Sequence, residues 1–171
     1  MIARALLRAV ASTAVLVVIY YLLPLDRSST PVAVTMLVIG LVVFVGLIGF
    51  QVRAIAGSPF PGIRAVEALA ISVPLFLLLF AATYVVLATI SAGNFTQPLD
   101  RTGALYFTVT VFATVGFGDI AAKTDVARLV VTGQMVADLI IIGLGVRVVV
   151  GAVTTGRRRR AATTGAVPPG G

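Results

Sequence analysis

The stretch Thr114-Val115-Gly116-Phe117-Gly118-Asp119 contains two glycines that alternate with residues carrying side chains. Glycine adopts left-handed backbone angles at little steric cost. A run that alternates such angles turns its carbonyl groups to one side, which neither a helix nor a regular strand does. Thr114 adds a hydroxyl at one end of that row of oxygens. Several copies around an axis would form stacked rings of oxygens that replace the hydration shell of a cation.

A short apolar segment at 103–112 precedes this run. A membrane span needs roughly 20 apolar residues in a helix, so the segment is too short to cross a bilayer. It fits a re-entrant helix, which we place at 103–113 with Asp100 or Thr102 as its N-cap. Irregular backbone at membrane depth is tolerated only where it is buried in protein or lines a water-filled cavity. The pattern therefore predicts that the run at 114–118 lines such a cavity.

Four longer stretches are apolar enough to span a bilayer. Two of them form an N-terminal pair within residues 1–56, and two flank the re-entrant helix in a unit at 62–156, where they occupy 65–92 and 125–153. We therefore predict an all-α integral membrane protein with four transmembrane helices. The re-entrant helix and its loop lie between the third and fourth. Residues 157–171 are predicted to form a basic, disordered cytoplasmic tail.

The composition favours a membrane protein and excludes most catalytic chemistry. Of the 171 residues, 59% are apolar and 11% are charged, whereas a soluble domain has about 25% charged residues. The chain has no Cys and no His, which removes thiolate chemistry and the commonest metal ligand and general base. With only six acidic residues, a pair of catalytic carboxylates is improbable. We predict no enzyme activity and no cofactor.

The positive residues behind the net charge of +7 are distributed as in a membrane protein and not as on a nucleic-acid-binding surface. Lys and Arg gather in the cytoplasmic loops of membrane proteins. With four spans, the side that holds both termini carries eight cations and the other side four, so we predict that both termini are cytoplasmic. A basic cluster next to a span predicts either contact with anionic lipid headgroups or a simple stop-transfer anchor. That cluster consists of Arg157, Arg158, Arg159 and Arg160.

The run at 114–119 resembles the selectivity-filter signature of potassium channels, in which Tyr usually stands where this chain has Phe117. The likeness extends to the segment 104–110, which resembles a pore helix, and to 119–129, which resembles the start of an inner helix. It covers residues 93–153, with 65–92 as the outer helix of the two-helix pore-domain family. The two N-terminal helices are an addition to that minimal pore. The predicted location is the plasma membrane, and the compact design is typical of a bacterial protein.

The resemblance implies passive conduction of K⁺ through a homotetramer, because one chain supplies one of the four strands of the filter. It implies that K⁺ is bound by backbone carbonyl groups of the filter, which also includes Gly118. The carbonyl ligands are those of Thr114, Val115, Gly116 and Phe117. Two alternatives remain open. Phe117 lacks a phenol hydroxyl that often braces the filter, and Ala113 stands where the family often has a second Thr. Because both changes alter the support of the filter, one alternative is a weakly selective cation channel. The other alternative is a non-conducting membrane scaffold that keeps the pore fold.

Two further positions near the filter follow from the resemblance. Thr110 stands behind the filter, at a supporting position that some relatives fill with Glu. Asp119 stands at the mouth, where it either attracts cations or braces the filter by hydrogen bonding. None of the first three spans carries the repeated Arg or Lys of a voltage sensor.

Asp138 is the acidic residue inside the fourth span. It lies 14 residues past Thr124, which is about 21 Å along a helix and places it at or below the bilayer midplane. A carboxylate at that depth normally faces a wet cavity or a partner. One hypothesis puts one Asp138 per subunit in the central cavity, where it concentrates cations or binds polyvalent blockers. The other has Asp138 hydrogen-bonded to Gln134, one turn earlier, or to a neighbouring helix.

Overall fold

The computed structural model describes residues 2–22, 30–56 and 61–164. Its elements are, in chain order, α1 (Ile2–Leu22), α2 (Thr30–Ala56), α3 (Pro61–Ile90), the short 3₁₀ helix η1 (Ala92–Asn94), α4 (Arg101–Phe112) and α5 (Asp125–Thr164). Among the described residues, two segments are long and apolar enough to cross a membrane, Arg64–Ile90 in α3 and Asp125–Arg147 in α5. Shorter apolar stretches occupy α1 and α2, at Val10–Leu22 and Val38–Gln51. The predicted all-α membrane fold is confirmed.

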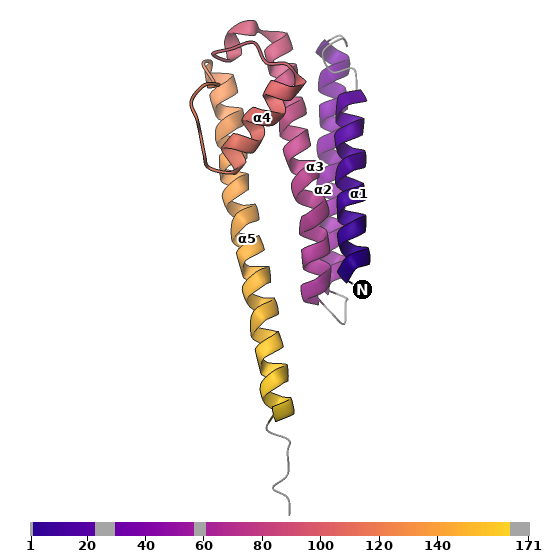
Figure 1. The fold of residues 1–171 in the computed structure, drawn as a ribbon. Coiled ribbons are helices and arrows are strands. Elements are labelled where there is room, and N and C mark those ends of the chain that lie inside the picture. The colour runs from indigo at the N-terminus through magenta and orange to yellow at the C-terminus, as the bar shows by residue number, and fades with distance from the viewer. Residues whose placement is uncertain (1, 23–29, 57–60, 165–171) are drawn as a thin grey trace, which may run out of the picture.

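Helix α3 is the centre of the arrangement, because α1, α2, α4 and α5 all pack against it. Figure 1 shows α1 and α2 alongside α3, with the short α4 tilted between α3 and α5 near one end of the bundle. At that end α1 and α3 finish and α5 begins, and we call it the pore-loop end. The start of α1 and the end of α5 lie toward the opposite end (Figure 1).

Helix α5 is longer than the sequence pattern indicates. We predicted an inner helix at 125–153 and a disordered tail at 157–171, whereas α5 continues to Thr164. Arg and Ala have high helix propensity, so the segment that includes the four arginines extends the helix already formed. The rest of the predicted tail, 165–171, lies outside the described residues. Helix α3 likewise begins earlier than predicted, at Pro61, a residue type favoured at the first position of a helix.

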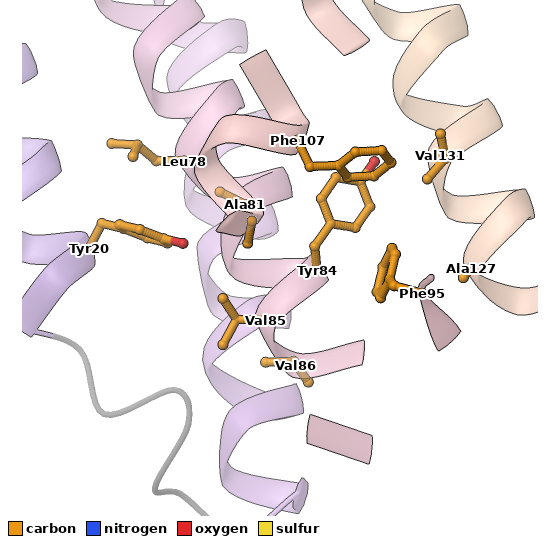
Figure 2. Packing of buried hydrophobic residues seen from close by; sticks show 11 residues of the cluster. Tyr20, Leu78, Ala81, Tyr84, Val85, Val86, Phe95, Phe107, Ala127 and Val131 are labelled. Carbon is orange, nitrogen blue, oxygen red and sulfur yellow. The ribbon is translucent and has the colours of Figure 1, made fainter. Parts of the chain in front are cut away.

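An aromatic cluster fixes α4 between α3 and α5. The ring of Tyr84 on α3 lies 5.1 Å from that of Phe107 on α4 and 5.8 Å from that of Phe95, both edge-to-face. Ala127 and Val131 of α5 belong to the same buried cluster, and Figure 2 shows them on the far side of the aromatic rings from α3. Each edge-to-face pair contributes about 0.5–1.5 kcal/mol beyond the burial of its apolar area. The packing therefore sets the position of α4 from both sides.

Candidate functional site

Helix α4 starts at a defined cap and ends inside the bundle. Its N-cap is Asp100, one of the two predicted residues, whose carboxylate accepts a hydrogen bond from the backbone N–H of Gly103 at 2.6 Å. The helix has 12 residues, which is about 18 Å and well short of a bilayer. After Ala113 the chain returns to the pore-loop end, where α5 begins (Figure 1). The C-terminal end of α4 carries partial negative charge, which favours a cation nearby.

The run that follows α4 alternates left-handed and ordinary backbone. Thr114, Gly116 and Gly118 have φ of 56°, 55° and 78°, and the residues between them have negative φ. The glycine spacing predicted the second and third of these positions but not Thr114. A left-handed conformation costs a side-chain-bearing residue about 1–2 kcal/mol. Strain of this kind is typical of functional sites, where the surrounding structure holds it in place.

The backbone N–H groups of the run converge on the end of α4. Those of Val115 and Gly116 both donate to the carbonyl oxygen of Thr110, at 3.0 and 3.4 Å. In a trans peptide the N–H and C=O groups point in opposite directions, and every described peptide is trans. The carbonyl groups of Thr114 and Val115 share these two peptides, so they point away from α4. Two of the predicted carbonyl ligands thus form a row on the open side of the run.

Thr110 contacts the run at 114–118 through its backbone rather than its side chain. Its hydroxyl donates to the carbonyl of Phe107 within α4, at 2.8 Å. Its carbonyl oxygen is the shared acceptor for the two N–H groups of the run. The residue is 9% exposed. The geometry therefore places Thr110 at a supporting position behind the run.

The side chains of Val115 and Phe117 in the run are exposed in a single chain. Val115 is 53% exposed and Phe117 is 69% exposed, although both are large apolar residues. The ring of Phe117 stacks on that of Tyr106 of α4, with centroids 6.3 Å apart and an interplanar angle of 4°. In the single protomer these two side chains are therefore largely uncovered.

Asp119 is held through its backbone carbonyl by two side chains. Its backbone carbonyl accepts from the Gln97 amide at 2.7 Å and from the Thr96 hydroxyl at 3.3 Å. These contacts fix the backbone at Asp119 and leave both predicted roles of its side chain open. The sequence pattern gave no sign of Gln97 or Thr96, which lie in an irregular polar segment without periodicity.

A second set of contacts joins the two chain segments that enter and leave the pore loop. Asn94 is 6% exposed, and its side chain donates to the carbonyl of Leu87 at 2.7 Å and accepts from the hydroxyl of Thr124 at 2.6 Å. Its backbone carbonyl accepts from the N–H of Lys123 at 2.9 Å. The end of α3 and the start of α5 are therefore fastened together at the pore-loop end.

Gln134 connects three helices through a buried polar junction. Its Oε1 accepts from the hydroxyl of Tyr84 on α3 at 2.6 Å. Its Nε2 donates to the carbonyl of Thr108 on α4 at 3.1 Å and to Oδ2 of Asp138 at 3.3 Å. Gln134 is 0% exposed and Asp138 is 3% exposed. We call these four residues the polar junction.

The polar junction favours one of the two hypotheses for Asp138. The carboxyl group is hydrogen-bonded to Gln134 inside the chain, as one hypothesis states. The central-cavity hypothesis requires an open carboxylate, and this one is covered by its own protomer. Its second oxygen, Oδ1, is buried without a hydrogen-bond partner in the part of the chain that the structure describes.

Residues 72–155 match the family model described as "Ion channel". The matched segment begins within α3 and includes α4, the run at 114–118 and most of α5, while α1 and α2 precede it. No curated protein and no solved structure matches the chain. The match covers just under half of the chain, and over this segment the chain is similar to ion channels, which are transport proteins and not enzymes.

Proposed function

We propose that this protein is a potassium-selective channel in which four copies of the run at 114–118 surround a common axis. The observation that carries the proposal is the backbone of that run. Alternate left-handed residues turn the N–H groups of Val115 and Gly116 onto Thr110, so the carbonyl groups on the same peptides face the open side. Carbonyl rings of this kind replace the hydration shell of K⁺. The ligands are the carbonyl groups of Thr114, Val115, Gly116 and Phe117.

The homotetramer is part of the same proposal. One chain offers one row of oxygens, and the exposed Val115 and Phe117 need a cover that further copies of the chain supply. The permeant ion needs no acidic side chain, because neutral carbonyl dipoles and the C-terminal ends of four α4 helices stabilise it.

The proposed setting is a bacterial plasma membrane with both termini in the cytoplasm. The pore-loop end then faces outward, and the cluster at Arg157, Arg158, Arg159 and Arg160 lies on the cytoplasmic side. Anionic lipid headgroups are the proposed partners of this cluster. The support for this orientation is the excess of Lys and Arg on the side of the termini.

Ion flux from liposomes tests the proposed function. The purified protein is reconstituted into vesicles loaded with K⁺, and efflux is followed with a dye that reports compensating proton entry. We expect rapid K⁺ efflux that Ba²⁺ stops, and much slower efflux from vesicles loaded with Na⁺. Equal K⁺ and Na⁺ efflux would favour the weakly selective cation channel. A complete lack of Ba²⁺-sensitive flux would favour the non-conducting scaffold.

Asp138→Asn is expected to leave permeation unchanged. The side chain lies within the protomer against Gln134, so neutralising it removes no charge from the ion pathway. Asn keeps the size of the side chain and its hydrogen-bonding ability. Single-channel conductance and the block by polyvalent cations provide the measurement. A fall in conductance or a loss of block would restore the central-cavity hypothesis.

A further inference from the structure

The last turn of α1 is hydrogen-bonded to the first turn of α4 in both directions. The hydroxyl of Tyr20 donates to the backbone carbonyl of Arg101 at 2.8 Å, and the hydroxyls of Tyr21 and Thr102 hydrogen-bond at 3.2 Å. In return, Nη1 of Arg101 donates to the backbone carbonyl of Tyr20 at 3.3 Å and to that of Tyr21. We call these four residues the clamp. Its two halves are separated by about 80 positions in the sequence.

The guanidinium of Arg101 caps the C-terminus of α1. The last four carbonyl groups of a helix have no partner within the helix, and a cation there also interacts favourably with the helix dipole. Helix α1 has no basic residue in its own last turn. The first residue of α4 supplies that charge from outside. Two of the last carbonyl groups of α1 therefore receive hydrogen bonds from the helix that leads into the run at 114–118.

Tyr20 makes the clamp part of the protein core. The residue is 3% exposed and belongs to the same buried cluster as Tyr84 and Phe107. Figure 2 shows its ring directed from α1 toward α3. A tyrosine that only anchored α1 at the lipid–water interface would present its hydroxyl to headgroups and water. Here the hydroxyl donates a hydrogen bond to α4 instead.

We propose that α1 contributes to the function of the pore, and that the clamp determines how stable the conducting conformation of the filter is. This inference rests on the proposed function. Arg101 and Thr102 open α4, and near the other end of the same helix the carbonyl of Thr110 holds Val115 and Gly116. A helix of 12 residues transmits a displacement of its first turn to its last. The position of α1 is thereby coupled to the run at 114–118. The four clamp residues act as positioning residues, because they hold α4 and through it this run.

Single-channel recording of Arg101→Gln tests the inference. Loss of hydrogen bonds to a charged group implies a change on the order of tenfold in the equilibrium between conducting and non-conducting filter. We expect conducting bursts to shorten by that factor, with partial recovery in Arg101→Lys, which keeps a cation at the end of α1. Lys123→Gln is the matched control, because it removes an exposed cation from the same end of the bundle. Its bursts should stay within about twofold of the native protein.

Tyr20→Phe provides a smaller change that keeps the ring and removes only the hydroxyl, so the test holds if Arg101→Gln fails to assemble. Burst durations and reversal potentials equal to those of the native protein in both variants would overturn the inference. In that case the contacts only anchor α1.

A stability measurement separates the clamp from the proposed function. If the native protein conducts no K⁺, the function fails whatever the clamp does. Unfolding of Tyr20→Phe, Arg101→Gln and the double variant then measures whether the two residues are coupled. Coupling in a protein that does not conduct would show that the clamp stabilises the fold without a role in conduction. That result would also contradict the inference.

Discussion

Gly116→Ala is expected to abolish K⁺ flux while the protein still folds and assembles. Gly116 has φ of +55°, and a Cβ added there would have no other atom within 4 Å in the protomer. The obstacle is therefore the backbone conformation, not a clash. Alanine at a left-handed position costs about 1 kcal/mol in each chain. Rotation to negative φ relieves this strain, but it breaks the bond from the Gly116 N–H to Thr110 and reorients the Val115 carbonyl.

Gly46→Ala is the matched control for this prediction. Gly46 lies in α2, and an added Cβ again meets no atom within 4 Å, but its φ is not in the left-handed region. Alanine is favoured over glycine inside a helix, so flux should stay within about twofold of the native protein. Both variants are compared in the liposome assay after size-exclusion chromatography has verified assembly. Native flux in Gly116→Ala would show that the run at 114–118 does not line the ion pathway.

Gln134→Leu is expected to cause the largest loss of stability. It removes the hydrogen bonds from Tyr84 and to Thr108 and Asp138, and it leaves these buried groups without the partner shown in the structure. Each unsatisfied buried group costs about 1–3 kcal/mol, and a charged group costs more. We expect the thermal transition of the detergent-solubilised protein to fall by about 10 °C or more. K⁺ flux should fall with it, because the junction holds α4 against α5.

Met135→Leu introduces the same residue at the next position of α5, where the side chain is 47% exposed. Its transition should fall by no more than about 2 °C. Tyr84→Phe completes the test, because it deletes the hydroxyl that Gln134→Leu leaves unpaired. We expect the double variant to be less destabilised than the sum of the two single variants. Strict additivity would mean that the bond between Tyr84 and Gln134 contributes nothing to the junction.

The features that depend on local sequence could be predicted, and those that depend on tertiary contacts could not. Glycine spacing indicated left-handed backbone at Gly116 and Gly118, and the length of the apolar segment indicated a helix too short to span the membrane. Both follow from residues adjacent in the chain. Thr114 was missed because its conformation is imposed by the hydrogen bonds around it and not by its residue type.

Asp138 is a second residue whose tertiary contacts could not be predicted from local sequence. Helical periodicity places it on one face with Gln134, so their contact was one of two hypotheses. Periodicity does not say which face of α5 packs against α3, and the partner that fixes this, Tyr84, is 50 residues from Gln134 in the sequence. The clamp was likewise not predicted, because its contacts join residues about 80 positions apart that belong to no shared pattern.

The most direct test of the central claim is the reversal potential under bi-ionic conditions. The reconstituted protein is placed in a planar bilayer with K⁺ on one side and Na⁺ at equal concentration on the other. Backbone carbonyl rings at 114–117 predict a reversal potential far from zero, with the sign set by K⁺ leaving its own side. A reversal potential near zero, with current carried equally by both cations, would contradict the account.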